Sequence, residues 1–206
     1  RPVWLAASTR DGEETLLLDA HRLLCVRLLE QTPLLVMVPR HPQRFDAVAE
    51  QITRAGFQLT CRSDALPTAA TEVWLGDSMG EMAAYYSMAD VAVMGGSLLP
   101  FGGQNLIEAA ACGTPTLVGP HTYNFAAAAE AAILTGAAQR LPDTASDTTT
   151  SGNTAPITAE AIAEALYRWL SDPPALALAA RATADFVQQS TGATARTLAL
   201  MTTSTQ

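Results

Sequence analysis

A glycine-rich segment at residues 95–108, GGSLLPFGGQNLIE, has the residue types of an anion-binding loop. Glycines let the backbone approach a ligand closely, and the free amides at a helix start attract a phosphate or a carboxylate. Asn105 and Glu108 are three residues apart, so in a helix they share one face, where Glu108 can accept hydrogen bonds from two ribose hydroxyls. The alternative is that the glycines only form turns and that Glu108 is a solvated helix residue.

A second segment, Gly76–Glu81 (GDSMGE), also lies between an apolar run and a helical pattern. Met79 and Gly80 can form the floor under a flat nucleobase. Ser78 and Glu81 also have the S-x-x-E spacing of a helix capping box, so helix initiation alone explains both. The two interpretations are compatible, because a capped first turn still offers backbone groups to a ligand.

Two further segments follow apolar runs and carry polar side chains. In PRHPQRF, which begins at Pro39, two prolines stiffen the chain so that Arg40 is presented at the end of the run, and arginine is suited to grip a phosphate. In GPHTYNF, which begins at Gly119, His121 can contact a sugar or a carboxylate. The simpler alternatives are a surface arginine and a histidine that only orients its loop.

Other sets of chemically active residues are not evident in the sequence. No Ser/His/Asp or Cys/His set stands out, and no HExxH motif or His/carboxylate cluster indicates a metal site. Every basic residue other than histidine is an arginine, which excludes lysine chemistry of the Schiff-base or Walker type. The net charge of -8 argues against a nucleic-acid partner. We therefore assign no catalytic residue, cofactor or metal to this chain and interpret it as a binding domain.

Short apolar runs alternate with amphipathic stretches along most of the chain. The predicted strands are Val3–Ala7, Leu34–Val38, Phe57–Cys61, Val73–Leu75, Val91–Met94, Thr116–Val118 and Ala137–Arg140. The predicted helices are Glu13–Glu30, Gln43–Ala55, Met79–Met88, Asn105–Ala111, Phe125–Leu134, Ala159–Leu170, Pro174–Gln189 and Thr194–Met201. This alternation predicts a doubly wound α/β domain, in which helices cover both faces of a parallel sheet. Ligands of such domains bind at the carboxyl ends of the strands, where the segments above lie.

We expect residues 1–206 to form a single domain cut from a longer protein, because the first strand begins almost at once. The stretch 142–156 is rich in Thr, Ser, Asp and Pro and is predicted to be a mobile polar surface loop. No run approaches the roughly 18 apolar residues of a membrane span and no signal peptide is evident, so we expect a soluble chain. The three cysteines are widely spaced, and we expect buried thiols without a disulfide.

Taken together, the segments resemble the carboxyl-terminal half of the 3-deoxy-D-manno-octulosonic acid (Kdo) transferases. The resemblance covers residues 1–141 and rests on six segments in order: VWLAASTRDGEE, VPRHPQRF, GDSMGEM, ADVAVMGGSL, GGQNLIEAAACGTP and GPHTYNF. It implies a glycosyltransferase of the GT-B type, with two facing Rossmann-like domains and no need for a bound metal. This chain is then the second domain, which binds CMP-Kdo. The first domain, absent here, binds the lipid A precursor and supplies the general base.

Carried over by position, the resemblance places CMP against the segments at the strand ends. The implied CMP contacts are Pro39, Arg40, Met79, Gly80, Glu81, Asn105, Leu106, Ile107 and Glu108. The candidate contacts to the sugar or the phosphate are Ser97, Gly102, Gly103, Gln104 and His121. In the implied mechanism an acceptor hydroxyl attacks the anomeric carbon, while helix amides and Arg40 stabilise CMP as it leaves. The sequence departs from the family pattern at Gln104, where a histidine is usual, and in the long 142–156 loop.

The resemblance also implies partners and a location. The full-length protein is expected to work in lipopolysaccharide biosynthesis on the cytoplasmic side of the bacterial inner membrane. Its missing half is expected to contact both the membrane and the lipid A precursor. Two other functions stay open: a non-catalytic nucleotide-binding or regulatory module, and a nucleotide-sugar epimerase, which can share the fold. A preference for CMP over UDP separates the transferase from the epimerase.

Overall fold

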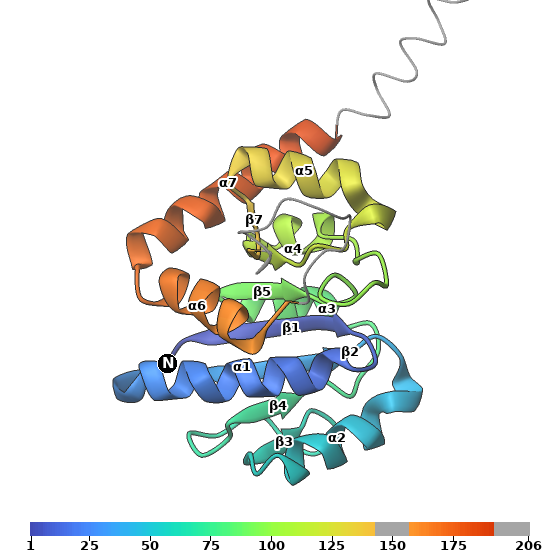
Figure 1. Ribbon diagram of the computed structural model, residues 1–206, viewed down its shortest axis with the longest axis vertical. Helices are drawn as coiled ribbons and strands as arrows, with labels where there is room; N and C mark the ends of the chain where they lie inside the picture. The colour runs from blue at the N-terminus through green and yellow to red at the C-terminus, as the bar shows by residue number, and fades with distance from the viewer. Residues whose placement is uncertain (143–156, 192–206) are drawn as a thin grey trace, which may run out of the picture.

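The computed structural model describes residues 1–142 and 157–191, and within them the chain forms one seven-stranded sheet (Figure 1). The order of the strands is β3-β4-β2-β1-β5-β6-β7, and every neighbouring pair is parallel. The strands are β1 (Val3–Thr9), β2 (Leu34–Pro39), β3 (Leu59–Cys61), β4 (Val73–Leu75), β5 (Val91–Met94), β6 (Thr116–Val118) and β7 (Ala138–Arg140). Each predicted strand is present, and the doubly wound α/β class is confirmed.

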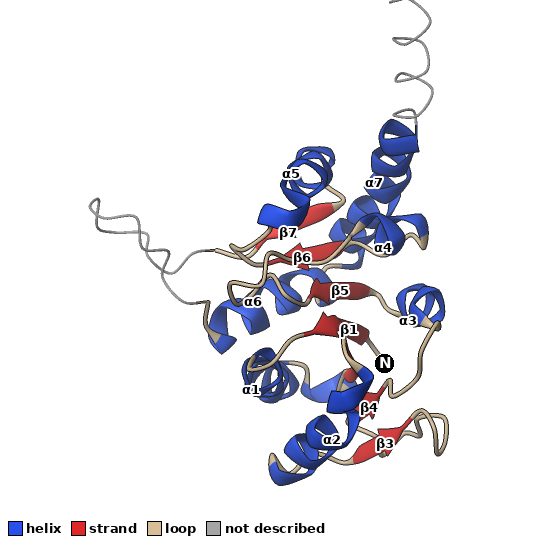
Figure 2. Cartoon of the chain, turned by 90° about the vertical axis from the view of Figure 1, so that its right-hand side faces the viewer, coloured by secondary structure: helices blue, strands red, loops and turns tan. Residues whose placement is uncertain are grey.

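Helices cover both faces of the sheet, as Figure 2 shows along the sheet edge. The helices whose apolar side chains pack on one face are α1 (Glu13–Arg27), α2 (Phe45–Arg54) and α6 (Ala159–Leu170). Those on the other face are α3 (Met82–Met88), α4 (Ile107–Ala111), α5 (Ala126–Thr135) and α7 (Pro173–Thr191). Three short 3-10 turns connect elements: η1 (Leu29–Gln31), η2 (Pro42–Arg44) and η3 (Tyr123–Phe125).

The central strand β1 explains why the strands are continuous apolar runs. Its side chains alternate between the two layers: Trp4 and Ala6 pack on the α1 side, and Leu5 and Ala7 pack on the α4 side. All four are fully buried. A strand that is covered on both faces has no polar side to present, so its sequence shows no alternation.

The chain changes direction across the sheet at β1. Ala6 pairs with Met37 of β2 on one side and with Val93 of β5 on the other. The chain leaves β1 into α1 on one face and leaves β5 into α4 on the opposite face. In doubly wound domains this switch point, at the carboxyl ends of the two strands, is where ligands bind.

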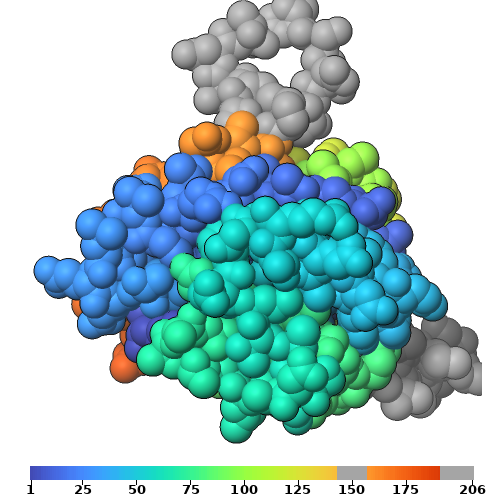
Figure 3. All heavy atoms as spheres, turned by 90° about the horizontal axis from the view of Figure 1, so that it is seen from below, coloured from blue at the N-terminus to red at the C-terminus, as the bar shows by residue number. Residues whose placement is uncertain are grey.

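The sheet ends at β3, where the view from below in Figure 3 shows α2 and the segments around β3 and β4 (cyan and green) as the nearest surface. Of the helices described, none combines the length and the apolar character needed to cross a membrane. The three thiols, Cys25, Cys61 and Cys112, are half-buried rather than buried as expected, and all are free.

Helices α2, α3, α4 and α5 begin later than predicted, and for α3 and α4 a residue before the helix explains the delay. Helix α3 begins at Met82 rather than Met79, because Gly80 adopts a left-handed backbone conformation with φ of 79°. Helix α4 begins at Ile107 rather than Asn105, because Asn105 Oδ1 accepts a hydrogen bond from the Ile107 amide and so turns the chain before the helix. Residues 143–156 of the predicted loop at 142–156 lie outside the described residues, as does the predicted helix at 194–201.

Candidate functional site

A buried carboxylate joins the loop after β1 to the glycine loop, which we define as residues 95–106. Glu13, the first residue of α1, is fully buried. Its Oε2 accepts hydrogen bonds from the amides of Arg10 (2.9 Å) and Gly96 (2.8 Å), and its Oε1 accepts from Leu98 (3.1 Å) and Leu99 (3.3 Å). Burial raises the pKa of Glu13, and the four amides act in the opposite direction. The carboxylate therefore fixes the start of the glycine loop against α1.

A second buried carboxylate, Glu14, ties the loop after β2 to the same helix. Arg44 donates two hydrogen bonds to it, from Nη1 to Oε1 (2.6 Å) and from Nη2 to Oε2 (3.1 Å). The Thr9 hydroxyl also donates to Oε1 at 2.7 Å. Arg44 further pairs with the exposed Asp11, and the bond to Glu14 is the main reason that its pKa is raised. The loops after β1 and β2 thus form one rigid unit.

The glycine loop is held from inside by Ser97, which is fully buried. Its hydroxyl donates to the Met94 carbonyl at 2.5 Å and accepts from the Gly119 amide at 2.8 Å. Gly102 has φ of 91°, and a Cβ atom there would lie 2.2 Å from Asn124 Nδ2. The Ser97 hydroxyl and Gly102 are therefore used within the protein to pack the loops after β5 and β6 together.

The other candidate sugar contacts lie beside one another at this junction. Gly103 has φ of 80° and donates from its amide to the Gly96 carbonyl at 2.6 Å. A Cβ atom on Gly103 would lie 3.2 Å from the His121 carbonyl oxygen, and one on Gly96 would lie 3.2 Å from Gln104 Nε2. The side chains of Gln104 and His121 are half-buried. The structure thus places the glycine loop at Gly103 against the backbone of the loop that carries His121.

Residues 79–81 form an exposed turn in front of α3. Met79 is 63% exposed, and Gly80 is exposed as well. Glu81 accepts a hydrogen bond from the Ser78 hydroxyl (2.5 Å) and one from Arg62 Nη2 (3.0 Å), and these two groups lower its pKa. The predicted capping box does not form, because the Ser78 hydroxyl donates to the Glu81 side chain and no side chain caps the amides of α3.

Residues 105–108 form a similar entry into α4. Asn105 and Glu108 are exposed, Ile107 is half-buried, and Leu106 is buried in the core. The Glu108 carboxylate makes no hydrogen bond or ion pair to another described residue. Helices α3 and α4 pack against the same face of the sheet and contact each other, and Cys112 Sγ, just after α4, lies 3.7 Å from the Ala83 carbonyl oxygen in the first turn of α3.

Arg40 follows β2, which lies between β4 and β1 in the sheet. Pro39 ends β2 and is buried beside Thr9 of β1, and the Arg40 amide donates to the Thr9 carbonyl at 3.0 Å. The Arg40 side chain is exposed, and within the described residues its guanidinium has no hydrogen-bonding partner or ion pair. It is therefore free to meet a ligand at the carboxyl edge of the sheet.

Sequence reasoning missed the residues that hold this edge in place. Glu13 and Arg44 were not singled out, because their partners lie on other loops and no local spacing reveals them. Arg10 was also missed. Its guanidinium lies 4.8 Å from the centre of the Phe101 ring and 3.1 Å from His41 Nε2, which accepts from it when His41 is neutral.

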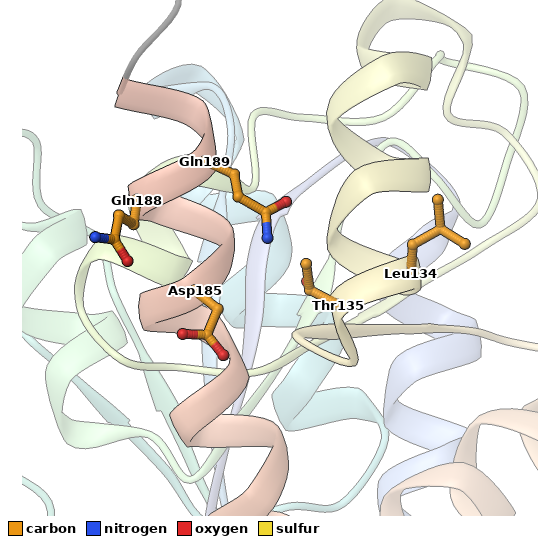
Figure 4. A pocket seen from close by; sticks show the side chains of 5 residues that line it. All are labelled: Leu134, Thr135, Asp185, Gln188 and Gln189. Atoms are coloured by element: carbon orange, nitrogen blue, oxygen red, sulfur yellow. The ribbon is translucent and has the colours of Figure 1, made fainter.

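A cavity away from the carboxyl edge of the sheet is lined by none of the candidate site residues. A cavity of about 430 Å³ between α5 and α7 is lined by Leu134, Thr135, Asp185, Gln188 and Gln189 (Figure 4). It lies toward the opposite edge of the sheet, because Thr135 ends α5 just before β7 begins. Among the described residues, no group of three or more His, Cys, Asp and Glu side chains is arranged to hold a metal ion.

Several known proteins are similar to the chain in sequence. No protein-family model matches the chain. It is 47% identical over 174 residues to the 3-deoxy-D-manno-octulosonic acid transferase of Bordetella pertussis, which covers 82% of this chain and 41% of that protein. It is 45% identical over 126 residues to the enzyme of the same name from Haemophilus influenzae, covering 61% of this chain and 29% of that protein. The chain therefore spans less than half the length of these relatives.

A solved structure matches nearly the whole chain. It is the C-terminal CMP-Kdo binding domain of WaaA from Acinetobacter baumannii, with a TM-score of 0.77 and 30% sequence identity. The match covers 91% of this chain and 90% of that domain.

Proposed function

The chain belongs to the Kdo transferase family as its C-terminal domain, and on this premise we propose that it binds CMP-Kdo as the sugar donor. The observation that carries the proposal is the convergence of three separate segments on one edge of the sheet. Arg40 follows β2, the turn at 79–81 precedes α3, and Glu108 lies in the first turn of α4. Arg40 and Glu108 present exposed charged side chains, and the turn at 79–81 presents the exposed side chain of Met79.

Each segment has a role that fits one part of CMP. Arg40 is a free cation and would bind the phosphate. Glu108 is a free carboxylate and would accept hydrogen bonds from the ribose hydroxyls, with Asn105 beside it. The exposed Met79 and Gly80 would lie under the base. Gln104 and His121, on the glycine-loop side, would face the sugar. The remaining predicted contacts would act through their backbone groups or by shaping these loops. They are Pro39, Glu81, Ser97, Gly102, Gly103, Leu106 and Ile107.

The proposed contribution of this chain to the reaction is electrostatic stabilisation of the leaving group, CMP. An acceptor hydroxyl attacks the anomeric carbon of Kdo, the bond from that carbon to the phosphate oxygen breaks, and CMP leaves with the negative charge. Arg40 and the amides before α4 would stabilise that charge, which needs no proton transfer from this chain. The general base would come from the other half of the full-length protein.

For the whole protein we propose transfer of Kdo from CMP-Kdo to a lipid A precursor in lipopolysaccharide biosynthesis, at the cytoplasmic face of the inner membrane. The family membership favours this function over an epimerase or a module without turnover. The acceptor and the membrane would be contacted through the half that this chain lacks.

The experiment that tests the donor role is calorimetric titration of this chain with CMP and, separately, with UMP. The proposal predicts saturable binding of CMP and weaker binding of UMP. Binding of UMP equal to that of CMP, or no saturable binding of CMP, contradicts it.

A further inference from the structure

Arg10 is a cation at the switch point of the sheet, and it is not among the proposed CMP contacts. It follows Thr9 at the end of β1, as Arg40 follows Pro39 at the end of β2, and Thr9 and Pro39 are paired neighbours in the sheet. Neighbouring strands lie about 4.8 Å apart, so the two arginines leave the sheet side by side.

Neither arginine has a carboxylate partner among the described residues. The seven ion pairs found there involve other arginines. The backbones of the two arginines are adjacent, and two guanidinium groups that approach each other repel unless an anion binds both of them. The buried carboxylate of Glu13 accepts four backbone amides, and its contact with Arg10 is to the backbone amide rather than to the guanidinium.

The Arg10 side chain is held in place, whereas that of Arg40 is free. Its guanidinium stacks on the Phe101 ring at 4.8 Å, and Nη1 lies 3.1 Å from His41 Nε2. A Cβ atom on Gly96 would lie 3.6 Å from Arg10 Cγ and 3.2 Å from Gln104 Nε2. Arg10 therefore lies on the glycine-loop side of the edge, beside Gln104.

The proposed donor carries two anionic groups close together. Kdo is an ulosonic acid, so its anomeric carbon bears a carboxylate as well as the oxygen that joins it to the phosphate of CMP. Two neighbouring arginines match two anions on one carbon, with Arg40 on the nucleotide side and Arg10 on the sugar side. Arginine binds a carboxylate through a planar pair of N–H donors.

Building on the proposed donor role, we propose that Arg10 binds the carboxylate of the donor sugar and makes the site select an acidic sugar over a neutral one. The stacking on Phe101 orients the guanidinium before the ligand arrives, which reduces the entropy lost on binding. Arg10 is thus a specificity-determining residue, separate from the residues that hold the nucleotide.

The test is calorimetric titration of the chain with CMP, with CMP-Kdo and with the methyl ester of CMP-Kdo, which lacks the carboxylate charge. Arg10→Gln is expected to weaken CMP-Kdo about tenfold or more, as for loss of a charge-assisted hydrogen bond, and to leave CMP within about twofold. The methyl ester is expected to bind the wild type and Arg10→Gln equally. Arg40→Gln is expected to weaken both CMP and CMP-Kdo.

The matched control is Arg22→Gln. Arg22 also stacks on an aromatic ring, that of Phe57 at 4.7 Å, but it projects from the middle of α1. The Arg22→Gln substitution removes one positive charge, as Arg10→Gln does, and is expected to change the affinity for neither CMP nor CMP-Kdo. Thermal unfolding of each variant verifies that it folds.

The outcomes separate the two proposals. If Arg10→Gln weakens CMP and CMP-Kdo by the same factor, or changes neither, the role of Arg10 is overturned while the donor site stands. If the wild-type chain binds neither CMP nor CMP-Kdo, the proposed function itself fails, and the role of Arg10 fails with it.

Discussion

Glu13 and Gly96 are 83 residues apart in the sequence, yet Oε2 of Glu13 accepts a hydrogen bond of 2.8 Å from the Gly96 amide. This contact fixes the glycine loop to the start of α1, and Glu13 also binds the amides of Arg10, Leu98 and Leu99. The same side chain thus positions both loops at the switch point of the sheet.

Replacing Glu13 is therefore expected to destabilise the protein. In Glu13→Gln the side-chain NH₂ group faces amide donors, so at least one buried donor is left without an acceptor, at a cost of about 2 kcal/mol or more. Urea denaturation measures the loss. The control is Glu50→Gln, in an exposed ion pair with Arg54, which is expected to cost less than about 1 kcal/mol. Equal stability of Glu13→Gln and the wild type would refute the anchoring role.

The ion pair of Glu14 and Arg44 gives a second stability prediction. Glu14 is fully buried, so Arg44→Gln leaves a buried carboxylate with the Thr9 hydroxyl as its remaining side-chain donor. We expect a loss of about 3 to 5 kcal/mol in the free energy of unfolding. Arg168→Gln removes an exposed arginine from its pair with Glu164 and is expected to cost about 0.5 kcal/mol. A loss for Arg44→Gln as small as that for Arg168→Gln contradicts the prediction.

His21 predicts how stability depends on pH. It is fully buried, its Nδ1 accepts from Trp4 Nε1 at 3.2 Å, and burial lowers its pKa from 6.5 to about 4. Between these values the unfolded chain binds the proton and the folded protein does not. The contribution of His21 to stability is thus present above pH 6.5 and is lost as the pH falls to about 4, by about 3 kcal/mol in total.

The measurement is the free energy of unfolding between pH 4 and 7 for the wild type and for His21→Asn, which keeps an acceptor for Trp4. We expect a shallower dependence on pH in this variant. Parallel curves for the wild type and His21→Asn would show that His21 is not the responsible group.

Glu108 gives a prediction on ligand affinity. Its exposed carboxylate is proposed to accept hydrogen bonds from the ribose, so Glu108→Ala is expected to weaken CMP about tenfold or more. Calorimetric titration measures the change. The control is Glu160→Ala, because Glu160 is likewise an exposed glutamate in the first turn of a helix, α6. Equal CMP affinity of Glu108→Ala and Glu160→Ala would remove Glu108 from the site.

The strands could be predicted from the sequence because burial on both faces leaves a simple signal. Every residue of Leu34–Pro39 is buried, and such a run of apolar residues is visible without any tertiary information. The positions of the candidate segments followed from the strands, because each segment comes directly after one of them. This is why Arg40 and Glu108 could be assigned to one edge from the sequence.

The helix starts and the supporting contacts could not be predicted in the same way. The start of α3 depends on the backbone of Gly80, and the start of α4 depends on which amide the Asn105 side chain meets. The partners of Glu13 lie on a loop that follows a distant strand, and those of Glu14 include Arg44 from another loop. Such contacts depend on the three-dimensional arrangement, and nothing in the local spacing indicates them.

The most direct test of the donor site is to map CMP onto the folded chain by NMR, following each backbone amide during a titration. If CMP binds at the carboxyl edge of the sheet, the largest shifts are expected at Arg40, at residues 79–81 and at residues 105–108. No shift is expected at the cavity between α5 and α7, at Thr135 and Asp185. Shifts concentrated at that cavity, with the carboxyl edge of the sheet unchanged, would contradict binding of CMP at the carboxyl edge.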